Sequence, residues 1–533
     1  MIFCVKVIMA ILFVNRYDMK LKCNLKVNII FPMVLLFLML PLFAAPIDDF
    51  KMKIIPTAGC NLSIVDEISN NNYSLSITSG VHNFFAGVFE DLDIVDPTTF
   101  SFDMTNAKTF EDQGNVSKWE GLYPVYSYGN LSYDTYIYYT KNDDGYWVSS
   151  DPFAKDKLAG NGKTPVQGVI PADFAEEFLS EDGNYWSSWQ DIKDTKIMQG
   201  MNRFTITRKF SLPNAVLSMR APFTYDYMFE YMKRLKETDV SGVTVHNIGK
   251  SIEEHNLYIV QISDPNATIE DLKDRRVVLM YANEDGDEPD GCWVVNGAMN
   301  YLIQGIQNND KEVSKILSEV TFLFLPMLDP VGWSNSTYAA ITYGFSTNDY
   351  AYIRPEILSY ARFIIDWISE KGNRLDVVVN LHNVECNEAP NVLCPILEGN
   401  QINEIEALNN YVLNKIEKLQ PSIKLSRSYW IIGGFSSNRL AGWCSYFFGN
   451  IQMAYEINSR YPENRLSLND LSILGKSFVI SFTDYFDSDE YERVLPRMDK
   501  RLAGQLALYA DLAHEYRDGD IMMQNYGILG RGF

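Results

Sequence analysis

Four short runs of almost unbroken apolar residues constrain this chain more than any other feature of its sequence. They read LYIVQIS, RRVVLMYA, VTFLFLPML and LDVVVNLH, and they lie between Leu257 and His382. Runs of this length are typical of parallel strands that are buried on both faces of a sheet. Segments with helical spacing lie between them, including residues 293–306 and 355–370. Strands that alternate with helices predict an α/β fold over residues 221–490, with helices on both faces of the sheet.

The part of the chain before this region follows a different pattern. Between residues 46 and 213, short stretches such as YSLSITSG and TFSFDMTN alternate apolar with polar residues and are separated by Gly, Asn and Asp. A period of two with turn residues between the stretches predicts antiparallel strands, and their close spacing predicts a β-sandwich domain. After the α/β region, residues 491–533 are predicted to form a helical extension, because Pro496 is a favourable first-turn residue.

Residues 1–45 are predicted to be a signal peptide. The apolar segment Ile29–Ala45 follows several lysines, and a basic segment followed by an apolar one is typical of secretory signals. A membrane anchor is the alternative interpretation, although the segment contains two prolines and is shorter than the ~20 residues that a span needs. We therefore expect a secreted or periplasmic protein, attached to a membrane only if this segment remains uncleaved.

The charge of the chain argues against one class of partner. It has 68 Asp and Glu against 46 Lys and Arg, a formal net charge of −22. Proteins that bind nucleic acid need a basic face to neutralise phosphates, so we expect no nucleic-acid partner. The chain has five histidines, which makes a site built from many imidazoles hard to form.

Polar residues follow several of the predicted strands at their carboxyl ends, where α/β sheets bind ligands. They are Glu284, Asp285, Asp287 and Glu288 after RRVVLMYA, Asn348 and Asp349 after VTFLFLPML, His382 at the end of LDVVVNLH, and Glu456 in IQMAYEIN. Carboxylates and a histidine can hold Zn²⁺, and a further glutamate can act as general base on a water molecule. The same residues also fit a solvated acidic turn and a hydrogen-bonded core histidine, and spacing alone leaves both interpretations open.

Several motifs resemble those of the M14 zinc carboxypeptidases, especially the cytosolic-carboxypeptidase-like branch. APFTYDYMFEYMKRL resembles the opening Pro-Tyr-Thr-Tyr helix of the family, and DEPDGCWVVNGAMNYLI resembles its HPGE-x4-W helix. LPMLDPVG, NLHNVE and MAYEINS resemble the Pro-x-x-Asn-Pro-Asp-Gly turn, the Asp-Leu-His motif and the Thr-x-Glu strand, in the same order. The resemblance implies a mixed carboxypeptidase-like sheet with a β-sandwich before it, one bound Zn²⁺, and a peptide or related amide as substrate.

The resemblance also implies roles for individual residues of a metal site. Glu288 and His382 match two of the zinc ligands of the family, and Asp285 stands where the family has its first histidine. Glu456 matches the general base. Two carboxylates beside one histidine would lower the effective positive charge of the metal and make its bound water less acidic.

The implied substrate-binding residues depart further from the family. Asn348 matches the asparagine that helps to hold the terminal carboxylate of a substrate, but the arginine that normally follows it is Asp349 here. Asp349 would repel a carboxylate and favour an amine, whereas arginine binds carboxylates in a strong, directional pair. The second arginine, which polarises the scissile carbonyl, has no counterpart in this segment. Loss of such oxyanion stabilisation typically costs about 3 kcal/mol.

Two hypotheses follow from this pattern. The first is a zinc-dependent, carboxypeptidase-type hydrolase with altered metal and substrate-end binding. The second is an inactive relative that binds a peptide or a cell-surface polymer through the same cleft. The retained Glu288, His382 and Glu456 favour the first, and the missing histidine and arginines favour the second.

Overall fold

The structure of the protein is a computed structural model. The chain divides into two compact units, residues 1–51 and 52–533. The structure describes residues 51–488 apart from these gaps: 78–83, 104–118, 155–157, 160–164, 166–169, 171, 199–200, 269–274, 335–354, 370–374, 385–390, 396–400, 422, 424–428, 433–439, 443 and 445–449. The predicted signal peptide, the predicted helical extension and the predicted substrate-binding residues Asn348 and Asp349 therefore lie outside the described residues.

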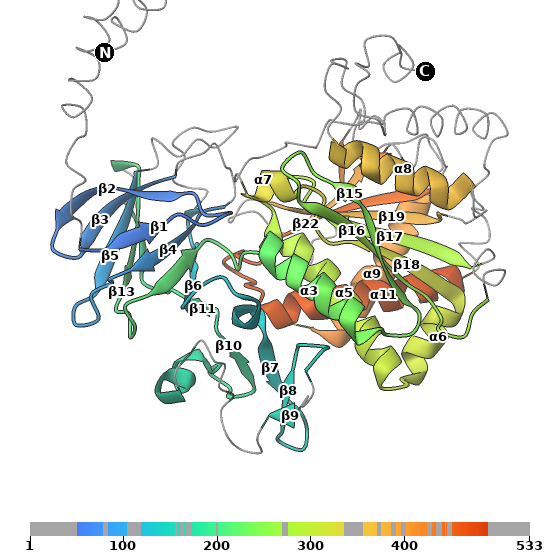
Figure 1. The fold of residues 1–533 in the computed structure, drawn as a ribbon, viewed down its shortest axis with the longest axis horizontal. Helices are drawn as coiled ribbons and strands as arrows, with labels where there is room; N and C mark the ends of the chain where they lie inside the picture. The colour runs from blue at the N-terminus through green and yellow to red at the C-terminus, as the bar shows by residue number, and fades with distance from the viewer. Residues whose placement is uncertain are drawn as a thin grey trace, which may run out of the picture. The chain divides into compact units, whose positions relative to one another are not determined.

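The β region, which we define as residues 52–220, consists of short strands and 3-10 helices, coloured blue to green in Figure 1. Its strands are β1 (Lys53–Ile55), β2 (Leu62–Ser69), β3 (Asn72–Ile77), β4 (Ala86–Glu90), β5 (Thr98–Asp103), β6 (Val125–Tyr128), β7 (Tyr138–Lys141), β8 (Trp147–Ser149), β9 (Leu158–Ala159), β10 (Tyr185–Ser187), β11 (Gln190–Asp191), β12 (Thr195–Met198), β13 (Arg203–Arg208) and β14 (Ala215–Ser218). Its 3-10 helices are η3 (Tyr133–Tyr136) and η4 (Ala172–Phe178).

Two five-stranded sheets of the β region pack face to face. Their strand orders are β1-β4-β14-β6-β11 and β12-β13-β5-β3-β2, and a four-stranded sheet has the order β10-β7-β8-β9. Aromatic side chains fill the space between the five-stranded sheets: the rings of Phe89 and Phe100 are 5.0 Å apart, and those of Phe85 and Phe102 are 4.9 Å apart. Most pairings described here are antiparallel, with β3 and β5 parallel. The arrangement is consistent with the predicted sandwich-like domain.

The α/β region, residues 221–488, is built on an eight-stranded mixed sheet. Its strand order is β15-β16-β18-β17-β19-β22-β20-β21. The strands are β15 (Val243–Lys250), β16 (Asn256–Ile262), β17 (Arg276–Ala282), β18 (Val320–Leu325), β19 (Val377–Asn383), β20 (Asn391–Pro395), β21 (Tyr429–Ile432) and β22 (Ile451–Ile457). The helices are α3 (Tyr225–Thr238), α5 (Pro289–Gln307), α6 (Lys311–Glu319), α7 (Pro330–Ser334), α8 (Pro355–Ser369), α9 (Gln401–Leu419) and α11 (Leu468–Phe486).

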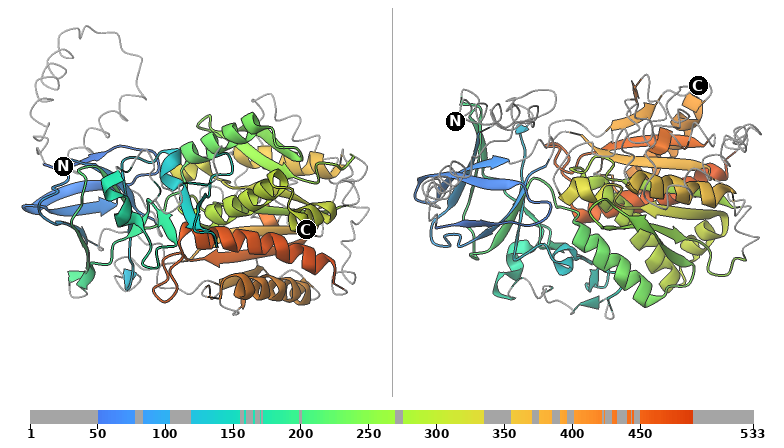
Figure 2. Two further views of the ribbon diagram at one scale, coloured as in Figure 1. Left: turned by 90° about the horizontal axis from the view of Figure 1, so that it is seen from below. Right: turned by 45° about the horizontal axis from the view of Figure 1, so that its top comes forward.

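Helices cover both faces of this sheet, as predicted. Val278 and Met280 of β17 belong to the core formed with α3, α5, α9 and α11, and Figure 2 shows α9 and α11 together on this side. The alternate residues Val277 and Leu279 belong to a second core with Tyr360 and other residues of α8. Successive side chains of a strand point to opposite faces, so a continuous apolar run is what a strand between two helical layers requires.

The direction of one predicted strand was wrong. The run LYIVQIS forms β16, but β16 pairs antiparallel with both β15 and β18. A tight turn joins β15 to β16, in which the amide of Ser251 donates to the carbonyl of His255 at 2.7 Å. Parallel strands need a long crossover connection, and this turn leaves no room for one. The strands β17, β18 and β19 are mutually parallel, as predicted, and β22 is parallel to β19.

Helix α5 is held tightly in place behind the sheet. A Cβ atom on Gly297 would lie 2.4 Å from the Cα of Ser472, and one on Gly475 would lie 2.1 Å from the carbonyl oxygen of Val294. These glycines let α5 and α11 cross at close range. Pro289 occupies the first helical position of α5, where a missing amide hydrogen costs little. Within the described part of the chain, none of the helices combines the length and apolar character needed to cross a bilayer.

Candidate metal centre

The carboxyl ends of β17, β19 and β22 meet at one edge of the sheet. Ala282 of β17 is the register partner of Leu381 in β19, and His382 is the register partner of Glu456 in β22. The loop that follows β17 leads directly into the N-terminus of α5. Three segments that are far apart in the sequence therefore present side chains to the same place.

Asp285, Glu288 and His382 converge in this place. One ligand atom from each lies within 4.8 Å of the other two, and all three residues are buried. Nδ1 of His382 lies 2.8 Å from Oε2 of Glu288 and 3.2 Å from Oδ2 of Asp285. The structure thus brings together the three residues that the sequence analysis proposed as metal ligands.

Local interactions shape the loop that carries the two carboxylates. Asn283 has a left-handed conformation, with φ of 62°, and its side-chain amide donates to the carbonyls of Asp285 and Gly286 at 3.3 and 3.1 Å. Asparagine tolerates this conformation better than most residues. The amide of Glu288 donates to the carbonyl of Asp285 at 3.2 Å. The resulting turn places the side chains at positions 285 and 288 on the same side.

The other nitrogen of His382 faces two further polar residues. Nε2 lies 3.3 Å from Oε2 of Glu284 and 2.6 Å from Nδ2 of Asn380. Asn380 also donates to Glu284 at 2.6 Å, and Glu284 accepts from the amide of Leu440 at 3.2 Å. Glu284 is one of the acidic residues predicted to follow the strand, but its contact with His382 was not predicted. Its position directly after the strand was the one available signal.

Glu456 lies beside His382 on the adjacent strand. Register partners in neighbouring strands project to the same face of a sheet, and the charge of Glu456 contributes to raising the pKa of Glu288. Arg460, four residues further along the chain, has other partners. The guanidinium of Arg460 contacts Asp191 at 2.7 Å and the carbonyl of Leu466 at 2.9 Å.

Burial and charge shift the proton equilibria of this cluster. Burial raises the pKa of Glu288 well above its usual value; Asp285 acts in the same direction, and His382 opposes it. Burial disfavours the imidazolium form of His382, but the charge of Glu288 and the hydrogen bonds that the imidazolium donates to the surrounding carboxylates hold its pKa well above its usual value. A buried cluster with excess negative charge binds positive charge, either as protons or as a metal ion.

The donor set fits a divalent cation. Glu284, Asp285 and Glu288 are all buried around the imidazole of His382. Buried carboxylates are costly unless they are paired or bind metal. Carboxylate oxygens together with an imidazole nitrogen are ligands that Zn²⁺ accepts. Asp285, Glu288 and His382 are therefore the residues that could hold the ion.

Comparisons of sequence show which known proteins part of this chain resembles. The model of the zinc carboxypeptidase family, Peptidase_M14, matches residues 228–344. Cytosolic carboxypeptidase 2 of Danio rerio is 22% identical over 177 residues, which cover 31% of this chain and 24% of the relative. Cytosolic carboxypeptidase 6 of Homo sapiens is 20% identical over 167 residues, which cover 30% of this chain and 32% of the relative. The matched segment spans only about a quarter to a third of the length of these relatives.

Comparisons of structure extend the similarity to the β region. A metallo-carboxypeptidase from Burkholderia cenocepacia has a TM-score of 0.59 at 13% identity and covers 82% of this chain and 99% of its own. A metallo-carboxypeptidase from Pseudomonas aeruginosa, solved with (2-guanidinoethylmercapto)succinic acid, has a TM-score of 0.51 at 14% identity and covers 82% of this chain. The α/β region alone is too short to account for this coverage, so the shared fold includes sheets of the β region. The fold is that of metallocarboxypeptidases. Residues 228–344 of the chain are similar in sequence to the M14 zinc carboxypeptidase family.

Proposed function

We propose that the protein is an exported zinc-dependent hydrolase of the carboxypeptidase type, which cleaves a peptide or a related amide. The observation that carries this proposal is the convergence of Asp285, Glu288 and His382 within 4.8 Å, next to a glutamate in register on the adjacent strand. Asp285, Glu288 and His382 hold the metal ion. Asn348 and Asp349 bind the end of the substrate, and this assignment rests on the sequence motif alone.

Each residue of the site has a distinct task in this mechanism. A bound Zn²⁺ would supply Lewis acidity toward the scissile carbonyl and toward a water molecule. Glu456 accepts a proton from the attacking water and returns it to the leaving nitrogen, which is general acid–base catalysis. Glu284 and Asn380 hold the imidazole of His382 through Nε2, which keeps Nδ1 directed at the carboxylates.

The substitutions at this site change what it can bind and how fast it can react. Asp285 in place of a histidine adds a negative charge, so the metal is a weaker acid than in a site with two histidines. Asp349 in place of an arginine repels a substrate carboxylate and favours an amine. We therefore propose slow hydrolysis with altered terminal specificity rather than removal of ordinary C-terminal residues.

The second candidate function is an inactive binding protein. The observations that favour it are the acidic residue at position 285 and the absence of both arginines from the expected motif. A protein of this kind would hold a peptide or a cell-surface polymer in the same cleft without cleaving it. Retention of a buried, converging ligand set favours the hydrolase, because a site that only binds peptide has no need of it.

The proposed location rests on residues 1–45, whose pattern is that of a signal peptide. We propose a secreted or periplasmic protein that contacts a membrane only if this segment stays attached. The word cytosolic in the names of the two relatives refers to those proteins and is not applied to this chain. The net charge of −22 supports the proposal that nucleic acid is not a partner.

Metal analysis of the purified protein tests this function. We expect zinc to bind at a ratio of one ion per chain and to be lost in the His382→Ala variant. Glu456→Gln should keep the metal and lose hydrolysis of a library of peptides with free, amidated and amine-bearing ends. A protein that takes up no metal at saturating zinc would contradict the hydrolase. Bound metal without hydrolysis of any library member would favour the binding protein.

A further inference from the structure

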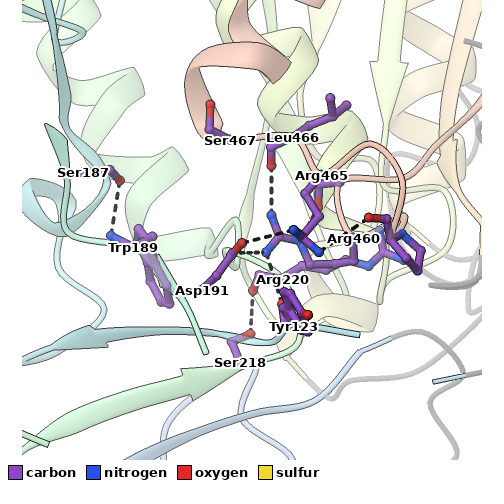
Figure 3. A network of polar contacts seen from close by, with 12 residues as sticks. Tyr123, Ser187, Trp189, Asp191, Ser218, Arg220, Arg460, Arg465, Leu466 and Ser467 are labelled. Atoms are coloured by element: carbon purple, nitrogen blue, oxygen red, sulfur yellow. Dashed lines mark hydrogen bonds and ion pairs between the residues drawn. The ribbon is translucent and has the colours of Figure 1, made fainter. Parts of the chain in front are cut away.

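A completely buried arginine connects the β region to the metal centre. Arg220 follows β14, and its side chain is 0% exposed. Its Nη1 donates to Oδ2 of Asp290 at 2.5 Å and to Oδ1 of Asn458 at 3.2 Å, and its Nη2 donates to the carbonyl of Val384 at 2.7 Å. Figure 3 shows Arg220 within the polar network that surrounds it. One guanidinium thus contacts three segments of the α/β region.

Each of the three contacts falls beside a residue of the proposed site. Each partner of Arg220 lies two residues beyond a residue of the site: Asp290 follows Glu288, Val384 follows His382, and Asn458 follows Glu456. These three residues come from the N-terminus of α5, from β19 and from β22. Arg220 therefore links all three segments that carry the site, although it does not belong to any of them.

We propose that Arg220 is the positioning residue of the metal centre, a role that rests on the function proposed above. It does not touch the reacting atoms; it fixes the three segments relative to one another. The guanidinium is planar and presents its donors in a rigid fork, so its contacts set angles as well as distances. A metal site needs its ligands held to within about half an ångström, and three separate segments do not provide this by themselves.

Both ends of Arg220 are fixed by further hydrogen bonds. On the main-chain side, the hydroxyl of Ser218 donates to the carbonyl of Arg220 at 2.6 Å. On the side-chain side, Asp290 also accepts from the amide of Ser459 at 2.7 Å and from its hydroxyl at 2.8 Å. The β region is thereby joined through Arg220 to the beginning of α5 and to the loop after β22.

A second arginine provides a matched control. Arg460 is also buried and also joins the two regions, through Asp191 at 2.7 Å and the carbonyl of Tyr123 at 3.3 Å (Figure 3). Its side chain further contacts the hydroxyl of Ser459 and the carbonyl of Leu466. None of these side-chain contacts is a contact of Arg220. Replacing the Arg460 pair removes a buried arginine–carboxylate pair from the same interface and keeps the side chain of Arg220 with its direct partners.

The test compares two double variants of the full chain with the wild type. Arg220→Met with Asp290→Asn removes the positioning contacts without leaving a lone buried charge, and Arg460→Met with Asp191→Asn is the control. Zinc affinity is measured by competition with a chelator, and the visible spectrum of the Co²⁺-loaded protein reports ligand geometry. We expect the Arg220 double variant to bind zinc about 10–100-fold more weakly, which is the usual effect of losing support around ligands. Its cobalt spectrum should change, and the control should match the wild type.

The outcomes separate this proposal from the proposed function. Equal zinc affinities and equal cobalt spectra in the two double variants would overturn the positioning role. If the Arg220 double variant does not fold, Arg220→Lys decides, because it keeps the charge beside Asp290 but loses the rigid fork; wild-type affinity and spectrum in that variant would overturn the proposal. If the wild type binds no metal, the proposed hydrolase fails, and hydrogen exchange decides the positioning role by itself. Faster exchange at residues 285–290, 380–384 and 456–459 together would support it, and a change confined to one segment would overturn it.

Discussion

Two buried polar clusters of this protein differ in how their charged side chains are paired. In the cluster between the regions, each buried arginine has a carboxylate partner: Arg220 with Asp290 at 2.5 Å and Arg460 with Asp191 at 2.7 Å. In the cluster around His382, several buried carboxylates surround a single imidazole. The first cluster is complete as the chain folds. Among the described residues, the second places three carboxylates within 3.3 Å of one imidazole, an arrangement that favours the uptake of protons or a cation.

The largest expected effect on stability comes from removing one buried arginine of the first cluster. Arg220→Met leaves Asp290 buried without its cation, and we expect a loss of about 3–5 kcal/mol in the free energy of unfolding. Chemical denaturation measures this loss. Adding Asp290→Asn should recover much of it, because the buried charge is then gone. If Arg220→Met by itself were as stable as the wild type, the charge of Asp290 would not depend on Arg220 for compensation.

The next largest effect is the stabilisation of the fold by zinc bound at the cluster around His382. At a free zinc concentration one hundred times the dissociation constant, binding should stabilise the fold by about 2.7 kcal/mol. Thermal or urea unfolding with zinc and with a chelator measures the difference. His382→Ala is the control and should lose this dependence. Equal stabilisation of both proteins by zinc would place the ion elsewhere.

A smaller effect should follow from changing the support of His382. Glu284→Gln preserves the size of the side chain but removes the carboxylate that faces Nε2 at 3.3 Å. We expect zinc affinity to fall about 10–100-fold, because such supporting groups orient a histidine ligand and raise its basicity. Isothermal titration with zinc measures this change. An unchanged affinity would limit Glu284 to a structural hydrogen bond with Asn380 and Leu440.

The smallest effect is expected at the exposed end of the first cluster. Arg465 lies 3.5 Å from Asp191 and stacks on the ring of Tyr123 at 4.3 Å, and about a third of its side chain is exposed. Exposed ion pairs contribute roughly 0–1 kcal/mol, so Arg465→Met should change the free energy of unfolding by no more than that. If Arg465→Met lost as much unfolding free energy as Arg220→Met, the difference in burial would not explain the different contributions of the two arginines to stability.

Much of the fold was predictable from local pattern. The runs that became β17, β18 and β19 are largely apolar, as a core on both faces of the sheet requires, and these strands are parallel as predicted. The direction of β16 was not predictable in this way, because an apolar run carries no information about its neighbours. The tight turn at Ser251–His255 makes β16 antiparallel to β15, and the pairing within the sheet makes it antiparallel to β18 as well.

Some residues of the candidate site could also be predicted from the sequence, and others could not. Asp285, Glu288 and His382 could be proposed because each lies at a strand end and because their order resembles a family motif. The part played by Glu284 could not, since it depends on a distance to a residue nearly one hundred positions away. Arg220 was not singled out at all, because it lies outside every motif and in the other region of the chain.

The sequence by itself indicated the buried central strands, because burial between two helical layers favours continuous apolar runs. It also determined which acidic residues stand at the strand ends. Only the tertiary structure decided that His382 lies beside Glu456 and that the guanidinium of Arg220 contacts three segments at once. Strand register and side-chain convergence arise from packing between elements distant in the chain, and no local pattern of residues encodes them.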